Sequence, residues 1–324
     1  MSQFASALIA WQRKHGRRGL PWQGNRDPYR IWLSEVMLQQ TQVAAVIPYY
    51  ERFLKKYPTV EALAAASEDE VLQLWSGLGY YARGRNLHAA AKTIAAHGFP
   101  ETLQGIMELP GVGRSTAAAI AAFAFGERAA ILDGNVKRVL ARCYGVAGER
   151  ELWKVAERLL PKRGIKTYTQ ALMDLGATVC VRKKPRCEAC PVRGRCVARK
   201  ENRVGELPAP RPKRILPLRK ATWFVFVRDG EVLLERRPGK GLWGGLWTFP
   251  ETRVYRPARS RNLAPMEHGF THFRLRIQPV LCEGGKKISR AEAPGRLWLD
   301  VADAVSAAVP APVRTLLGRL PAAR

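Results

Sequence analysis

The sequence predicts two domains of different fold class, an all-α N-terminal domain and a smaller α+β C-terminal domain. The chain of 324 residues is about twice as long as a domain of about 150 residues. In its N-terminal part, apolar residues recur at the spacing of a helix face, as at Val136, Val139, Leu140 and Cys143. Toward the C-terminus, short runs of β-branched and aromatic residues indicate strands instead.

The N-terminal domain is expected to comprise residues 1–206. Alanine-rich runs around Ala89 and Ala117 favour helices, and strand signals are scarce. Glycine and proline mark short loops, for example at 98–100 and 110–113. These features predict a bundle of helices joined by short connections.

A basic linker is expected over residues 207–220. Four prolines alternate there with arginine and lysine, which favours an extended and semi-rigid chain. The C-terminal domain is expected over 221–324. The run 222–227 reads as a strand, Asp229-Gly230 is a strong hairpin signal, and two helical patterns follow at 301–309 and 313–320.

One further strand of the C-terminal domain is predicted by alternation alone. Phe273, Leu275 and Ile277 alternate with polar residues, as expected of a strand that buries one face. Together with the hairpin and the two helical patterns, this strand predicts an α+β domain.

The charge balance points to a polyanionic partner. The chain has 54 Lys and Arg against 27 Asp and Glu, a net charge of +27. The alternative is a solvated basic surface with no partner. Apolar residues make up 47% and charged residues 25%, which excludes a disordered or fibrous chain. The longest apolar stretch, 117–125, is too short to span a membrane, so we expect a cytoplasmic protein without a membrane partner.

Four cysteines have the spacing of a metal or cluster site. Cys180, Cys187, Cys190 and Cys196 lie close together in the sequence, and a disulfide framework is not expected in a reducing compartment. Both zinc and an iron–sulfur cluster accept four thiolates. A zinc ribbon usually has two C-x-x-C pairs, whereas only Cys187 and Cys190 form one. The spacing therefore favours a [4Fe–4S] cluster, with zinc or no metal as the alternatives.

A glycine-rich turn at 109–115 connects two predicted helices. Its two glycines allow a ligand to approach the backbone closely, and N–H groups at the start of a helix bind anions. The turn is thus a candidate site for a DNA phosphate. A plain helix connection is the alternative, because a single G-x-G is a weak signal.

Two carboxylates are candidate catalytic groups. Asp133 directly precedes the amphipathic helix that contains Val136, where an aspartate commonly caps a helix. Glu35 lies on a mostly apolar helical stripe with Ile31 and Leu38, where ionisation is costly. It is either a partly exposed residue or an acid kept protonated for catalysis.

Several motifs together resemble the adenine DNA glycosylases of the MutY type. They occur in the family's order and cover the N-terminal two-thirds of the chain. The motifs are residues 32–43, 77–83, 109–116 and 132–138 and the four cysteines. The resemblance implies a helix–hairpin–helix glycosylase domain with an iron–sulfur cluster loop. Residues 237–250 resemble the Nudix fold, so the C-terminal domain is expected to be Nudix-like.

The resemblance implies which reaction to expect. Related glycosylases of the endonuclease III type have a lysine where this chain has Ser115, and that lysine forms a Schiff base and cleaves the strand. Serine does not form a Schiff base. We therefore expect a monofunctional enzyme of base excision repair that hydrolyses adenine from 8-oxoguanine:adenine and guanine:adenine mispairs. The nearest alternative is an endonuclease III-type glycosylase and lyase.

Two other functions remain as alternatives. A Nudix pyrophosphatase would need clustered carboxylates after Pro250 to hold a metal ion, and the sequence that follows does not supply them. A DNA scaffold without catalysis would require Glu35 and Asp133 to be incidental. The expected partner is double-stranded DNA with 8-oxoguanine:adenine mispairs, bound by a monomer.

By resemblance, the functional residues fall into four groups. The catalytic residues are Glu35, Asp133 and Asn135. The cluster ligands are Cys180, Cys187, Cys190 and Cys196. The adenine pocket comprises Arg18, Leu20, Trp22, Gln170 and Met173. The lesion and DNA contacts are Gln40, Thr41, Leu78, Tyr80, Gly111, Val112, Gly113, Arg114, Ser115, Phe270, Thr271 and His272.

Overall fold

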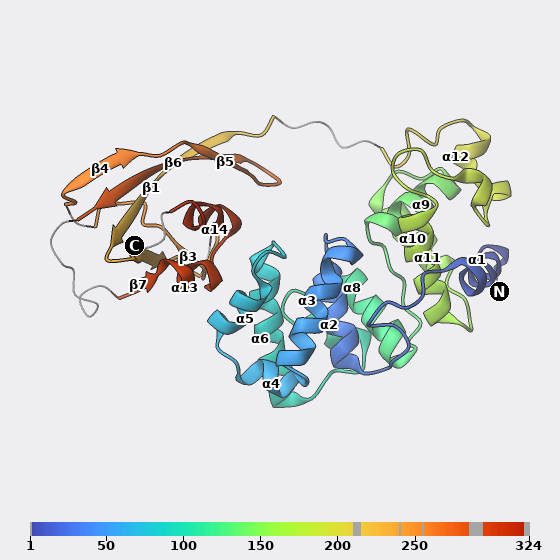
Figure 1. Cartoon of the computed structure of the whole chain (residues 1–324). Helices are drawn as coiled ribbons and strands as arrows, with labels where there is room; N and C mark the ends of the chain where they lie inside the picture. The colour runs from blue at the N-terminus through green and yellow to red at the C-terminus, as the bar shows by residue number, and fades with distance from the viewer. Residues whose placement is uncertain (1, 210–214, 240, 255, 285–293, 321–324) are drawn as a thin grey trace. The chain divides into compact units, whose positions relative to one another are not determined.

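The computed structural model describes residues 2–209, 215–239, 241–254, 256–284 and 294–320 (Figure 1). Contacts divide the chain into two compact units. The first comprises residues 1–65 and 86–212, and the second comprises residues 66–85 and 213–324. No helix among these described residues has the length and the apolar character needed to cross a membrane.

The first unit is helical, as predicted. Its α-helices are α1 (Gln3–His15), α2 (Pro28–Leu38), α3 (Val43–Lys56), α4 (Val60–Ala65), α6 (Tyr81–His97, shared with the second unit), α7 (Leu103–Glu108), α8 (Arg114–Ile120), α9 (Gly134–Tyr144), α10 (Glu149–Arg158), α11 (Ile165–Thr178) and α12 (Val197–Lys200). Helix α8 continues into the π-helix η1 (Ala121–Phe125), and two 3-10 turns, η2 (Cys187–Ala189) and η3 (Arg193–Arg195), precede α12.

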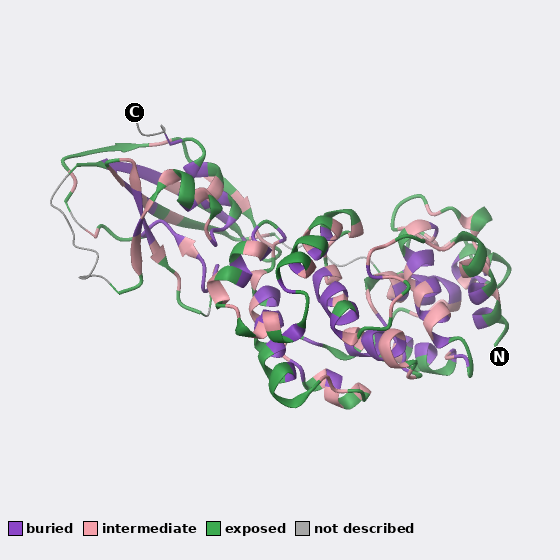
Figure 2. Cartoon of the chain, turned by 60° about the horizontal axis from the view of Figure 1, so that its bottom comes forward, coloured by how far each residue is buried: buried purple, intermediate pink, exposed green. Residues whose placement is uncertain are grey.

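The core of the first unit forms where α1, α9 and α11 pack together. The predicted apolar face of α9 is buried, and Leu8 of α1 and Leu175 of α11 belong to the same cluster. The helices carry buried residues on one side and exposed residues on the other (Figure 2). This amphipathic pattern is the reason why the sequence periodicity predicted the helices.

The second unit contains a mixed sheet of seven strands within its described residues. The strands are β1 (Leu218–Arg228), β2 (Glu231–Arg236), β3 (Trp247–Thr248), β4 (Arg259–Asn262), β5 (Met266–Gly269), β6 (Arg274–Glu283) and β7 (Arg296–Asp300). The strand order is β3-β2-β1-β6-β4, β5 pairs with β6, and β7 pairs with β2. Helices α13 (Val301–Ser306) and α14 (Ala311–Leu317) follow the last strand, so the α+β prediction is confirmed.

Local signals predicted three of the strands, β1, β2 and β6. Asp229 and Gly230 both have positive φ, 48° and 76°, and form the two-residue loop that joins β1 and β2. Strand β1 pairs in parallel with β6, with Trp223 opposite Pro279. The alternation from Phe273 to Ile277 is confirmed, because every second residue of this stretch is buried.

Residues 66–85 belong to a different unit from the one predicted. They were expected in the helical domain, but they pack with the C-terminal sheet and its two helices. Helix α5 (Glu68–Trp75) contributes Leu72 to the core of the second unit. The Ser76 hydroxyl donates a hydrogen bond to the Val309 carbonyl at 2.9 Å and accepts one from Arg314 Nη2 at 2.8 Å.

The linker in the structure is also shorter than the predicted range 207–220. Strand β1 begins at Leu218, inside the range 207–220, because its register with β6 already starts there. At the other end, Leu207 is buried in the core of the first unit. Residues 210–214 lie outside the described residues.

Candidate active site

A cavity of about 290 Å³ opens in the first unit. Its walls come from α1, the loop after it, α2, η1 and α11. The lining residues are Gln12, Trp22, Gln23, Gly24, Asn25, Ile31, Ser34, Glu35, Phe123, Lys166, Thr167 and Gln170. The lining combines a few apolar side chains, Trp22, Ile31 and Phe123, with a larger number of polar ones, so the cavity can hold a small organic group that forms hydrogen bonds, such as a base.

Glu35 contributes an unusual acid to this cavity. Helix α2 begins at Pro28, and Asp27 caps it by accepting a hydrogen bond from the Tyr29 N–H at 2.9 Å. One turn before Glu35, Ile31 is buried, as expected of the apolar stripe. Burial, reinforced by the charge of Asp133, raises the pKa of Glu35 to about 8. The side chain is therefore protonated at neutral pH.

Asp133 caps helix α9. Its Oδ1 accepts a hydrogen bond from the Val136 N–H at 2.7 Å. Burial raises the pKa of Asp133, whereas the backbone N–H groups of Val136 and Asn135 and the charge of Arg138 act in the opposite direction. The capping interpretation of this residue is thus correct, and it is compatible with a catalytic role, which stays a prediction.

Asn135 is oriented by the half-buried Arg138. Arg138 Nη2 donates to Asn135 Oδ1 at 2.7 Å and to the Gly176 carbonyl at 2.6 Å. Arg138 Nε donates to the Cys180 carbonyl at 2.7 Å. The side-chain oxygen of Asn135 is thereby engaged, and neither Asn135 nor Asp133 is among the residues that line the cavity beside Glu35.

Gly176 allows α11 to approach α9 beside Asn135. A Cβ atom at Gly176 would lie 2.6 Å from the Asn135 Cβ and 3.0 Å from its carbonyl oxygen. We expect Gly176→Ala to destabilise the protein by about 1–3 kcal/mol, because backbone has to move. Thermal unfolding should show a melting temperature lower by roughly 3–10 °C. Gly205→Ala, where a Cβ meets nothing within 4 Å, is the matched control; equal melting temperatures would contradict the packing argument.

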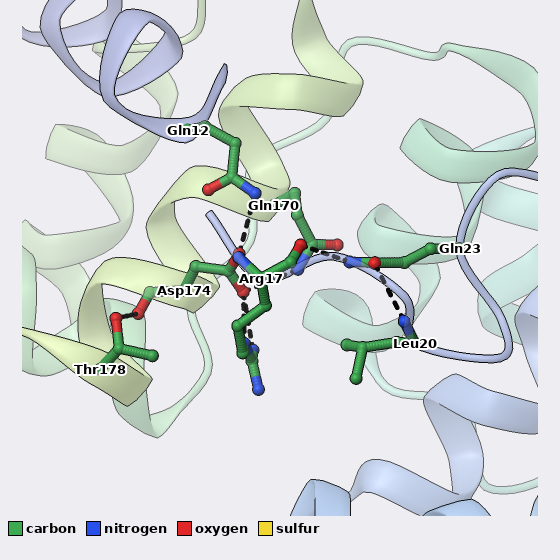
Figure 3. Close-up of polar contacts among 7 residues, drawn as sticks. All are labelled: Gln12, Arg17, Leu20, Gln23, Gln170, Asp174 and Thr178. Atoms are coloured by element: carbon green, nitrogen blue, oxygen red, sulfur yellow. Dashed lines mark hydrogen bonds and ion pairs between the residues drawn. The ribbon is translucent and has the colours of Figure 1, made fainter. Parts of the chain in front are cut away.

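The predicted adenine pocket is partly assembled. Trp22 and Gln170 line the cavity with Glu35, whereas Arg18, Leu20 and Met173 are not among its lining residues. Arg18 is exposed and donates to a backbone carbonyl in α1. The Leu20 backbone N–H donates a hydrogen bond to Gln23 Oε1 at 3.3 Å (Figure 3). Met173 packs against the hydrophobic core of the first unit.

Several residues that line the cavity were not predicted from the sequence. Lys166 lies one turn before Gln170 on the same face of α11, so helical spacing would have indicated it. Its Nζ donates to the carbonyls of Phe123 at 2.9 Å and Asn25 at 3.4 Å, and burial lowers its pKa. Gln12 reaches the cavity from α1, and no local signal marks it.

The predicted phosphate-binding turn lies between α7 and α8. Gly111 has φ of 77°, and a Cβ there would lie 2.7 Å from the Asn86 side chain, so this position requires glycine. Val112 is buried, and Gly113 caps α8 without a side-chain acceptor. The Ser115 hydroxyl accepts a hydrogen bond from the Leu132 N–H at 2.9 Å.

Neighbouring side chains fix this turn in place. Gln39 Nε2 donates to the Gly111 carbonyl at 3.3 Å and to the Thr116 hydroxyl at 3.2 Å. The predicted contacts Gln40 and Thr41 follow directly, and Gln40 is exposed with φ of 60°. Arg114 is also exposed, and it stacks on the Trp153 ring at 3.9 Å.

The remaining predicted lesion contacts lie in the second unit. Tyr80 is 45% exposed and adopts a φ of 49°, while Leu78 is buried. Phe270, Thr271 and His272 form the turn between β5 and β6. Thr271 and His272 are exposed there, and Phe270 is held by stacking on Phe273 at 4.4 Å between ring centroids.

The four predicted ligand cysteines line one common cavity. All four are free thiols. Arg142 is buried beside them; its Nη1 donates to Cys180 Sγ at 3.4 Å and to the Val181 carbonyl at 2.8 Å, and its Nε donates to the Leu207 carbonyl at 2.8 Å. Within the described residues, no three candidate ligands are grouped as for a single metal ion.

Comparisons with known families support both units. Residues 33–162 match the HhH-GPD superfamily base excision DNA repair proteins, and residues 222–319 match the NUDIX domain. The structure resembles a thermostable thymine-DNA glycosylase with a TM-score of 0.57 and 30% identity, over 61% of this chain and 95% of that one. It also resembles a non-covalent endonuclease III–DNA complex, with a TM-score of 0.54 and 25% identity, over 62% and 96% of the two chains.

Relatives match nearly the whole chain. The adenine DNA glycosylase of Buchnera aphidicola subsp. Acyrthosiphon pisum (strain APS) is 34% identical, over 97% of this chain and 96% of the relative. The adenine DNA glycosylase of Homo sapiens is 32% identical, over 95% of this chain and 72% of the relative. With a helical unit, a Nudix-like unit and relatives that span both, the chain belongs to the adenine DNA glycosylase family.

Proposed function

We propose that the protein hydrolyses adenine from 8-oxoguanine:adenine mispairs, and also from guanine:adenine mispairs, in double-stranded DNA. The observation that carries the proposal is Glu35, an acid with a pKa of about 8 in the wall of a base-sized cavity. Adenine inside a duplex is not accessible to such a cavity, so the nucleotide has to be flipped out of the stack.

The two carboxylates have complementary roles. Glu35 donates its proton to N7 of adenine, the bond between N9 and C1′ breaks with its electron pair going to the base, and adenine leaves as a neutral molecule. The sugar becomes oxocarbenium-like, and Asp133 stabilises the positive charge. Water then adds to C1′ and returns a proton to Glu35. Asn135 orients the sugar or the acid through its amide N–H groups.

The partner is duplex DNA, and the basic charge of +27 favours it. The backbone N–H groups at the start of α8 bind a phosphate, and the exposed Tyr80 fills the space left by the flipped base. Phe270, Thr271 and His272 contact the 8-oxoguanine. One chain carries all of these groups, so a monomer suffices.

A strand assay tests this function. The protein is incubated with duplexes that contain adenine opposite 8-oxoguanine, guanine or thymine, and the labelled adenine strand is run on a denaturing gel with and without alkali. We expect cleavage only after alkali, fastest opposite 8-oxoguanine and absent opposite thymine. Cleavage without alkali would instead indicate a lyase, and binding without cleavage would indicate a scaffold.

We also propose that Cys180, Cys187, Cys190 and Cys196 hold a [4Fe–4S] cluster. The donor set fits, because the four thiols line one cavity together with Cys143; burial raises the pKa of Cys180, and the Arg142 guanidinium beside it acts in the opposite direction. A bound cluster would hold the basic loop 181–195 in one conformation, in which its arginine side chains would be available to DNA phosphates.

Arg142 is expected to be essential for cluster retention. Arg142→Met removes the hydrogen bonds that join the cysteine loop to α9 and leaves buried carbonyls without donors. We expect the purified variant to contain less than about half of the wild-type iron and sulfide per chain, since the thiols lose their common orientation. Lys200→Met, at the exposed last residue of α12, is the control, and equal iron contents in all three proteins would contradict the role of Arg142.

A further inference from the structure

The glycine-rich segment 241–246 has no role in the reaction described above, although it belongs to the stretch that resembles the Nudix fold. It folds back tightly onto the chain that precedes it. The Gly245 N–H donates a hydrogen bond to the Arg237 carbonyl at 3.2 Å. A Cβ atom at Gly244 would lie 2.5 Å from the Gly239 carbonyl oxygen, so this position requires glycine. These contacts hold the segment in one conformation.

The segment lies against the two helices that flank Tyr80. Tyr80 lies between the end of α5 and the start of α6. From α6, Arg85 Nη1 donates a hydrogen bond to the Gly244 carbonyl. From α5, Leu72 approaches Gly245, where a Cβ atom would lie 3.4 Å from Leu72 Cδ1. The segment therefore contacts both helices that determine where Tyr80 is placed.

Trp243 extends the segment to the turn that begins with Phe270. Its side chain is buried, and its ring centroid lies 5.5 Å from that of Phe270 and 5.7 Å from that of His268. Trp243 has φ of 54°, a conformation that residues other than glycine rarely adopt, so the surrounding structure has to hold it there. The Phe270 N–H in turn donates to the Phe273 carbonyl at 2.9 Å, which closes the turn.

We propose that Arg85 and Trp243 are positioning residues that couple the recognition of 8-oxoguanine to the placement of Tyr80. Through Trp243 and Gly244, the turn 270–272 and the Tyr80 turn are held at a fixed separation, because packed protein interiors deform little. When the turn 270–272 holds 8-oxoguanine, Tyr80 is thereby placed at the same base pair. Guanine is not held by the turn and gains nothing from this connection. The inference rests on the proposed function, in which both elements contact the lesion.

The test measures single-turnover release of adenine opposite 8-oxoguanine and opposite guanine, in the wild type, Arg85→Met and Arg85→Lys. Methionine lacks a donor for the Gly244 carbonyl. We expect the ratio of the two rates, 8-oxoguanine over guanine, to fall about threefold to tenfold in Arg85→Met, the value of one hydrogen bond, with release opposite guanine changed less than about twofold. Lysine retains a cationic donor, so Arg85→Lys should keep more than about half of the wild-type ratio.

A purely structural role of Arg85 gives a different result. In that case both substrates react more slowly by the same factor, and an unchanged ratio in Arg85→Met overturns the proposal. Arg296→Met is the matched control. Arg296 Nε donates to Glu235 Oε2 at 2.9 Å and joins β7 to β2 rather than the two lesion contacts. Its ratio should equal that of the wild type.

A double-mutant cycle shows whether Arg85 acts through Tyr80. If it does, Arg85→Met lowers the ratio in the otherwise unchanged protein but hardly alters it when Tyr80→Ala is also present. An equal reduction of the ratio in both backgrounds means that Arg85 acts independently of Tyr80, and it overturns the proposal.

A second variant tests the same connection from its other end. Should Arg85→Met not fold, Trp243→Phe shortens the contact with Phe270 and leaves Arg85 in place, and the same loss of the ratio is expected. A preserved ratio in Trp243→Phe overturns the proposal. Wild-type protein that releases adenine from neither duplex would instead contradict the proposed function itself, which separates the two failures.

Discussion

Glu35→Gln is expected to slow adenine release by about 10³-fold while duplex binding changes little. Glutamine keeps the size of the side chain and removes the proton that the leaving base needs, and general acid catalysis contributes about 10²–10⁴-fold. Single-turnover base release and duplex affinity, measured on the same preparations, check this result. Normal turnover by the variant would exclude Glu35 as the acid.

The pH dependence follows from the raised pKa of Glu35. With a pKa of about 8, the carboxyl keeps its proton at neutral pH and loses it above this value. The rate of adenine release should therefore be nearly constant up to about pH 8 and fall up to tenfold per unit at higher pH. Single-turnover rates measured from pH 4 to pH 10 test this expectation. A decline centred near 4.5, the ordinary pKa of glutamate, would contradict the raised pKa of Glu35.

The buried carboxyl of Glu35 should also make the wild type less stable than Glu35→Gln at high pH. Between pH 4.5 and about 8 the folded protein holds a proton that the unfolded chain has released, so the contribution of Glu35 to stability decreases as the pH rises. Glutamine has no such dependence. Thermal unfolding should show Glu35→Gln gaining on the order of 10 °C over the wild type as the pH is raised through this window. A constant difference would mean that the surroundings of Glu35 do not raise its pKa.

Asp133→Asn is expected to reduce adenine release by about 10²–10³-fold without destabilising the protein. Asparagine caps a helix about as well as aspartate, so the hydrogen bond from the Val136 N–H is retained. The negative charge is lost, and with it the electrostatic stabilisation of the oxocarbenium-like sugar. Base release and thermal unfolding measured together separate the two roles of this residue.

A second helix cap supplies the control for Asp133. Asp300 caps α13 through a hydrogen bond from the Ala302 N–H at 2.8 Å, in the second unit. Asp300→Asn exchanges the same groups at a cap and should leave adenine release unchanged. If Asp133→Asn keeps full activity as well, Asp133 serves only as a cap.

The sequence by itself determined the local structure. The helix spacing at Val136, Val139 and Leu140 and the hairpin at Asp229-Gly230 depend on the preferences of neighbouring residues, and both are present in the structure. The motif around Glu35 likewise indicated an acid on an apolar stripe. Such features follow from the periodicity of apolar residues and from local backbone preferences. Both depend only on residues that are neighbours in the sequence.

Only the tertiary structure decided how distant stretches meet. The cavity joins Gln12 to Gln170, and Asp174 binds Arg17, which lies 157 positions earlier in the chain. Helix α5 packs with the C-terminal sheet although the sequence surrounding it is helical. Periodicity states which face of an element is apolar, but not which element covers that face. The contact between Asp174 and Arg17 therefore became visible only once packing had brought α1 and α11 together.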